Sequence, residues 1–126
     1  MKKIFILVFA VGVVFGYSCK KTPDDVVLIK NLLTEFQQAL IDKNPSQLDS
    51  LFAVKKELLQ KDPSEITAKI FSRDTQNLVI ADKRFEIHDS QAKVLFTLQG
   101  VGFEQKMNLY LVKYKNHWWI VNYEWQ

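Results

Sequence analysis

The stretch that decides the fold is "NLYLVKYKNHWWIVNYEW", residues 108–125. Polar and apolar side chains alternate on both sides of Lys115-Asn116, and this alternation with a period of two indicates strands. Two such runs joined by two turn residues predict an antiparallel hairpin. Because the turn sets the register, we expect Tyr114 to face His117 across the hairpin.

The same alternation extends towards the N-terminus and predicts further strands. We expect strands at about 77–88, 91–100, 103–114 and 117–125, the first interrupted around Asp82-Lys83. Short turns at Asp89-Ser90 and Val101-Gly102 set two more registers, and all three registers collect apolar side chains on one face. This apolar face consists of Phe85, Ile87, Ala92, Val94, Phe96, Leu98, Met107, Leu109, Leu111, Trp118 and Ile120.

Each of the three prolines follows a residue that can cap a helix. These pairs are Thr22-Pro23, Asn44-Pro45 and Asp62-Pro63. Because a capping oxygen satisfies free N–H groups and proline suits the first helical position, they predict three helix starts. We expect helices at about 23–43, 45–60 and 63–72, the second breaking near Val54. Apolar side chains recur along them at helical spacing, so the helices should pack on the apolar face of an antiparallel sheet, giving an α+β fold.

The first 18 residues have the pattern of a secretory signal peptide, with Lys2 and Lys3 before an uncharged apolar run. The run ends in Gly16-Tyr17-Ser18-Cys19, which resembles the lipobox of bacterial lipoproteins. That resemblance implies cleavage before Cys19, acylation of Cys19 with chains such as palmitate, and a tether over residues 19–22 before a domain at 23–126. Two alternatives remain: cleavage after Ser18 without a lipid, or an uncleaved N-terminal anchor.

Composition limits the remaining functions. The 17 basic and 14 acidic side chains become 15 and 14 once Lys2 and Lys3 leave with the signal peptide, a balance that gives no case for nucleic-acid binding. A single cysteine cannot form a disulfide within its own chain. Because no spacing of histidine and acidic residues suggests shared ligation and no glycine-rich phosphate loop exists, we expect no metal site and no cofactor.

Three segments resemble the nuclear transport factor 2-like (SnoaL-like, cystatin-like) superfamily. They are "LIKNLLTEFQQALIDKN" (residues 28–44), "LDSLF" (residues 48–52) and "YKNHWWIVNYEW" (residues 114–125), and the resemblance extends over nearly all of residues 24–126. It implies a cone-shaped domain in which helices close over a curled four-stranded sheet, sometimes around a pocket. Enzymes of the superfamily place acid–base residues in that pocket.

Two sets of candidate site residues follow from the predicted registers. The face turned away from the helices should carry an apolar and aromatic patch, which would mark an interface: Tyr110, Val112, Trp119, Val121, Tyr123 and Trp125. The concave face should carry three polar residues at one end of the sheet, which could line a pocket: Gln105, Asn122 and Glu124. His88 and His117 should lie away from the helices, outside any shielded site.

The function that best fits these observations is a non-enzymatic interaction or accessory domain of the bacterial cell envelope. It would be exported and held at the membrane by a lipid on Cys19, and its outer aromatic face would form a homodimer or bind another envelope protein. The alternatives are binding or sensing of a small ligand inside the cone and, third, an enzyme. No catalytic residue is assigned.

Overall fold

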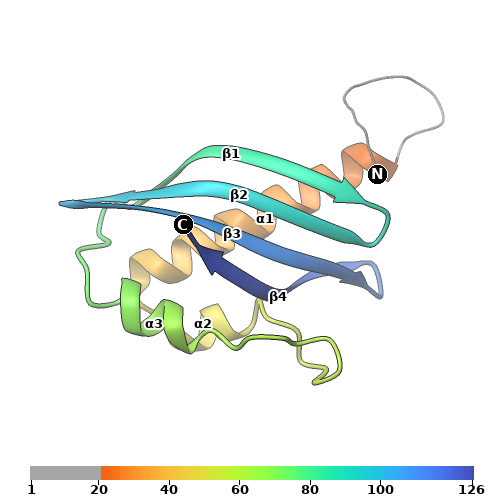
Figure 1. Cartoon of the computed structure of the whole chain (residues 1–126), viewed down its shortest axis with the longest axis horizontal. Coiled ribbons are helices and arrows are strands. Elements are labelled where there is room, and N and C mark those ends of the chain that lie inside the picture. The colour runs from red at the N-terminus through yellow and green to blue at the C-terminus, as the bar shows by residue number, and fades with distance from the viewer. Residues whose placement is uncertain (1–20) are drawn as a thin grey trace.

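The computed structural model describes residues 21–126, which form three helices followed by four strands. The helices are α1 (Lys21–Asp42), α2 (Pro45–Asp49) and α3 (Ser64–Ile70). The strands are β1 (Val79–His88), β2 (Gln91–Gly100), β3 (Phe103–Tyr114) and β4 (His117–Trp125). They pair antiparallel in the order β1-β2-β3-β4, and α1 runs behind the sheet in Figure 1. The predicted α+β class with a four-stranded meander is confirmed.

The predicted signal peptide, residues 1–18, and the predicted lipid attachment residue, Cys19, lie outside the described residues. Helix α1 begins at Lys21, two residues before the expected start at Pro23, so the last residues of the expected tether are helical. Between residues 21 and 126, no helix has the length and apolar character needed to cross a bilayer.

Helix α1 forms the layer that covers the sheet. Its side chains at the predicted apolar spacing are buried, and Ile29, Phe36 and Leu40 have no exposed surface. The helix ends because Lys43 adopts a left-handed φ of 51° and the Asn44 N–H donates to the Ala39 carbonyl at 3.0 Å. This arrangement satisfies a carbonyl that would otherwise lack a partner at the helix end.

Asn44 also starts the next helix, as predicted. Its Oδ1 accepts a hydrogen bond from the Gln47 N–H at 3.1 Å, and Pro45 occupies the first turn. The prediction that this helix extends to about residue 60 with a break near Val54 is wrong, because α2 already ends at Asp49. Helix α3 matches its prediction of 63–72 more closely. Pro63 is its N-cap, and the preceding Asp62 accepts a hydrogen bond from the Ser64 N–H at 3.0 Å.

The segment expected to extend α2 instead lies along the free edge of β4. The Ala53 N–H donates to the Ile120 carbonyl and the Ile120 N–H donates to the Leu51 carbonyl, both at 2.9 Å. Further along, the N–H groups of Gln60 and Lys61 both donate to the Val121 carbonyl. An edge strand exposes unpaired backbone N–H and C=O groups. If α2 had continued as a helix, the edge groups of β4 would have lacked the hydrogen-bond partners that this segment provides.

The strand pairings predicted from the three turns are confirmed. Ile87 pairs with Ala92, Val94 pairs with Leu109, and Tyr114 pairs with His117. The interruption at Asp82-Lys83 is also confirmed, as a register shift between Ala81 and Arg84. All eleven residues of the predicted apolar face belong to the core or pack against it.

A second register shift, in β4, was not predicted. Leu111 pairs with Ile120, whereas Tyr110 pairs with Asn122, so Val121 is one extra residue in β4. Such a bulge reverses the face to which every following side chain points. Tyr123 therefore lies in the core with 1% of its surface exposed, and Asn122 turns to the opposite face.

Candidate functional site

The polar pocket predicted on the concave face does not form. After the bulge, Asn122 and Glu124 lie on the outer face, where Asn122 donates to Gln60 Oε1 at 3.0 Å and Glu124 accepts from the Tyr110 hydroxyl at 2.6 Å. Gln105 keeps its predicted face, but its amide donates to backbone carbonyls, including that of Gln126 at 3.0 Å. The structure therefore leaves Gln105 on the helix side of the sheet and places Asn122 and Glu124 on the opposite face.

Large apolar side chains fill the space between α1 and the sheet. The Phe36 ring from α1 lies edge-on to the Phe96 ring of β2, with centroids 6.0 Å apart. Met107, Leu109 and Trp118 are each at most 2% exposed on the same side of the sheet. The helix-covered face of the sheet consequently provides packing between the two layers.

One charged pair does enter this interior, and sequence reasoning missed it. Asp25, in the second turn of α1, is 7% exposed, and its Oδ1 accepts from Lys113 Nζ at 2.8 Å and from Trp118 Nε1 at 3.3 Å. Lys113 and Trp118 are cross-strand partners in β3 and β4. The available signal was that Asp25 lies four residues before Ile29, on the apolar stripe of the helix.

The predicted aromatic interface is divided between two faces. Tyr110, Val112 and Trp119 lie on the outer face as expected, each partly exposed. Tyr123 lies on the helix side, where its hydroxyl donates to the Asp62 carbonyl at 2.6 Å.

Trp125 also lies on the helix side of the sheet. It packs against the core, and its Nε1 donates to Glu65 of α3 at 3.1 Å. The placement of Tyr123 and Trp125 in the outer interface is wrong because the bulge follows Ile120. Val121 itself is 3% exposed at the bulge.

A groove of about 340 Å³ crosses the outer face of the sheet. We call it the outer groove, and its lining residues come from all four strands and the segment beside β4: Gln60, Glu86, His88, Gln91, Ala92, Lys93, Tyr110, Leu111, Val112, Val121 and Asn122. Glu86 and Lys93 face each other across β1 and β2, and Lys93 Nζ lies 5.7 Å from the Tyr110 ring centroid. The groove thus combines charges of both signs with an aromatic ring.

A short hydrogen bond organises the polar part of this face. The Tyr110 hydroxyl donates to Glu124, and this bond raises the pKa of Tyr110 and lowers the pKa of Glu124 from their ordinary values. Asn108 lies beside this pair, 2% exposed, and its Oδ1 has no hydrogen-bond partner among the described residues. Because Glu124 is exposed and ionised at neutral pH, the pair presents a negative charge that the Tyr110 hydroxyl holds in place.

The described residues provide no centre for metal chemistry. Within residues 21–126, no three His, Cys, Asp or Glu side chains gather in a way that could hold a metal ion. The two histidines, His88 and His117, are both exposed at strand ends, as predicted from the registers.

Comparison with known proteins gives matches to solved structures. No family model and no curated protein sequence matches the chain. A nuclear transport factor 2-like protein of unknown function from Methylobacillus flagellatus superposes with a TM-score of 0.68 at 15% identity, covering 88% of this chain and 99% of that one. A second such protein, from Shewanella baltica, gives a TM-score of 0.65 at 14% identity, covering 88% and 98%.

A third solved structure has a more specific description. It is a protein from Shewanella frigidimarina proposed to be a ketosteroid isomerase, with a TM-score of 0.55 at 16% identity, covering 76% of this chain and 92% of that one. At these identities the similarity concerns the fold. Together with the order of helices and strands, it shows that residues 21–126 adopt the nuclear transport factor 2-like fold, with helices packed on a curled antiparallel sheet.

Proposed function

We propose that this protein is an envelope-anchored lipoprotein whose domain acts by non-enzymatic contact, pairing with a second copy through the outer face of the sheet. The observation that carries the proposal is that α1 covers one face only. In the part of the chain that the structure describes, no helix lies over the opposite face (Figure 1), whose outer groove is lined by the partly exposed side chains of Tyr110 and Val112. An uncovered sheet face with partly exposed aromatic side chains is typical of an interface.

The charges of the outer groove favour a second copy as the partner. Two-fold symmetry brings the same surface of both subunits together, so the surface must complement itself. Glu86 and Lys93 lie opposite each other on β1 and β2. Glu124 lies on the same face, where it accepts a hydrogen bond from the Tyr110 hydroxyl. Such adjacent opposite charges can exchange partners between two copies, while Tyr110 and Val112 supply the apolar centre.

The contacts give less support to the two alternatives. A ligand inside the cone would have used Asn122 and Glu124, which lie on the outer face. The interior instead carries the closed pair of Asp25 and Lys113, and an acid–base catalyst needs a titratable group free to meet its substrate. A reaction like that proposed for the Shewanella frigidimarina protein therefore has no assigned residue in this chain.

Pairing of two copies predicts a specific loss on substitution of Val112. The chain from Cys19, with its thiol alkylated, should have the mass of a dimer in solution by light scattering. Val112→Asp should give a monomer, because two-fold symmetry would bring the new carboxylates of both copies together. Val101→Asp is the matched control, since Val101 is 59% exposed in the turn between β2 and β3 and lies outside the outer groove.

A second variant keeps this test decisive if Val112→Asp does not fold. Lys93→Glu places a like charge beside Glu86 without adding an apolar-to-polar change, and it should also weaken the dimer. A wild-type chain that stays monomeric at high concentration contradicts the pairing of two copies.

The proposed lipid anchor predicts that palmitate labels a single residue, Cys19. Cells that express the full-length protein should incorporate labelled palmitate into it, and Cys19→Ala should abolish the label because the chain has no other cysteine. Ser18→Ala, which retains a small residue at the cleavage site, is the matched control and should remain labelled. Label that persists in Cys19→Ala would contradict attachment at this residue.

A further inference from the structure

The start of α1 and two of the hairpins lie at the same end of the domain. Figure 1 shows the first turn of α1 beside the end of β1, and the β1–β2 and β3–β4 turns reverse the chain at this same end of the sheet. The contacts of Asp25 with Lys113 and Trp118 hold α1 against the base of the β3–β4 hairpin. The next cross-strand pair, Tyr114 and His117, closes that hairpin.

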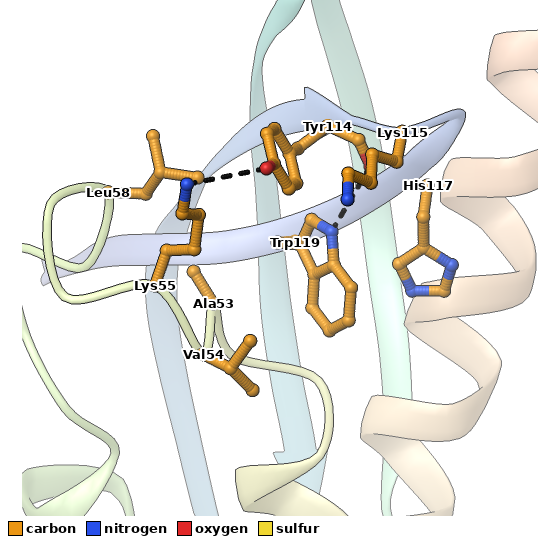
Figure 2. Close-up of a pocket in the computed structure, with 8 residues that line it drawn as sticks. All are labelled: Ala53, Val54, Lys55, Leu58, Tyr114, Lys115, His117 and Trp119. Atoms are coloured by element: carbon orange, nitrogen blue, oxygen red, sulfur yellow. Dashed lines mark hydrogen bonds between the residues drawn. The ribbon is translucent and has the colours of Figure 1, made fainter.

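A second pocket of about 340 Å³ opens beside this hairpin. We call it the hairpin pocket, and it is lined by Ala53, Val54, Lys55, Leu58, Tyr114, Lys115, His117 and Trp119 (Figure 2). Its wall is apolar and aromatic, with the His117 and Trp119 rings 4.3 Å apart. Val54 is 79% exposed, more than any other large apolar residue found exposed between residues 21 and 126.

Two positive charges converge on the same ring in this pocket. Lys55 Nζ lies 3.3 Å from the Tyr114 hydroxyl and 5.1 Å from the ring centroid, and Lys115 Nζ lies 5.5 Å from that centroid. No carboxylate lines the pocket, and within residues 21–126 neither lysine forms an ion pair. Two cations that are close together without a counter-ion favour binding of an anion.

We infer that the hairpin pocket docks this end of the domain on the surface of a bilayer that contains anionic phospholipids. The inference rests on the proposed anchor, because Cys19 precedes the start of α1 by two residues. Two residues span at most about 7 Å, so a lipid on Cys19 would hold the first turn of α1 at the membrane surface. The hairpin pocket would then face the headgroups.

The chemistry of the pocket matches that surface. Tyr114 and Trp119 combine an apolar body with a polar tip, as aromatic residues at membrane interfaces do. Lysines near an anionic surface are attracted to its phosphates, and their apolar stems can lie along the interface. Val54 and Leu58 would add apolar contact between the headgroups, and the domain would stand with its β2–β3 hairpin pointing away from the membrane.

The test attaches the domain to a membrane chemically, so that it does not depend on acylation in cells. The chain from Cys19 contains every described helix and strand, and Cys19 is its only thiol. It is coupled through Cys19 to a maleimide lipid in vesicles of phosphatidylcholine and phosphatidylglycerol with brominated acyl chains. The difference in tryptophan quenching between wild type and Trp119→Phe then reports the depth of Trp119. We expect strong quenching of Trp119, and loss of it in Val54→Asp.

A second measurement follows the charges. The same chain with its thiol alkylated should partition into phosphatidylglycerol vesicles at low salt, and Lys55→Gln/Lys115→Gln should reduce this partition about 30-fold, roughly fivefold for each lysine. Pure phosphatidylcholine vesicles should show no such difference. Lys83→Gln/Lys106→Gln and Val101→Asp are matched controls, because these residues are exposed away from the hairpin pocket, and they should match wild type.

Three results would overturn the inference. The first is an unquenched Trp119 in the coupled vesicles. The second is equal partition of wild type and Lys55→Gln/Lys115→Gln. The third is a change of solution mass in the pocket variants without any change in quenching, which would assign the pocket to contact between copies. Palmitate labelling in cells tests the anchor separately, so a missing anchor and a missing docking surface give different results.

Discussion

Insertion of one alanine after Val121 should unfold the domain. With the bulge at Val121 kept, the inserted alanine would pair with Tyr110, and every following residue of β4 would move one position along β3. Asn122 would then take the place of Tyr123 in the core, and Tyr123 would turn outward. The variant should show no cooperative unfolding transition by circular dichroism in urea at 25 °C.

The size of this effect follows from two costs. Removing a large buried aromatic side chain costs about 3–5 kcal/mol, and burying an unpaired amide costs a further ~1–3 kcal/mol. Their sum is comparable to the total stability of a typical domain, about 5–15 kcal/mol. Tyr123 would also lose its hydrogen bond to the Asp62 carbonyl and its edge-on contact with Phe52.

Val121→Ala is the control for this insertion. It keeps the register of β4 and removes only two methyl groups, so it should cost roughly 1–3 kcal/mol and leave a cooperative transition. If the insertion variant unfolded at the same urea concentration as wild type, the register after the bulge would not be what keeps Tyr123 in the core.

Lys113→Met should destabilise the domain by about 3 kcal/mol, more than Asp25→Asn. The Lys113 side chain is 24% exposed and the Asp25 side chain only 9%. Removing the lysine leaves a buried carboxylate with Trp118 Nε1 as its remaining donor, and an uncompensated buried charge typically costs about 3–5 kcal/mol. We expect the lower end of this energy range because the site of Lys113 is partly exposed to solvent.

Asp25→Asn should cost less, about 1 kcal/mol, because Lys113 can reach water and the amide oxygen can still accept from Trp118. The double variant Asp25→Leu/Lys113→Met should recover much of the loss, since apolar groups can replace a buried ion pair at little cost. Urea unfolding of wild type, the two single variants and the double variant measures these differences in stability. The exposed pair between Lys61 and Glu65 is the comparison, and Glu65→Gln should have a much smaller effect. Equal losses for Lys113→Met and Asp25→Asn would contradict this account of the pair.

Much of the fold was predictable because the relevant signals are local. The helix start at Asn44 depends on a side chain that bonds three residues along the chain. The register of Tyr114 against His117 depends on the two residues between them, Lys115 and Asn116, which both adopt positive φ. Such short-range interactions can be recognised from residue type and spacing.

The candidate site was less predictable because it depends on the edge of β4. The Val121 carbonyl accepts from the N–H groups of Gln60 and Lys61, residues about 60 positions away in the sequence. No pattern within "IVNYEW" reveals that partner, and an uninterrupted register was the simplest expectation. The one-residue shift then exchanged the faces of Asn122 and Tyr123, and with them the predicted pocket and part of the predicted interface.

The sequence by itself determined the class of fold, the four strands, the turn-defined registers and the apolar face on which α1 packs. Each of these depends on alternation, capping or turn chemistry over a few residues. Only the tertiary structure decided where the segment after α2 lies, which side chains of β4 reach the outer face and that Asp25 meets Lys113. The physical reason is that backbone groups at a sheet edge and a buried carboxylate must find partners, and those partners come from distant parts of the chain.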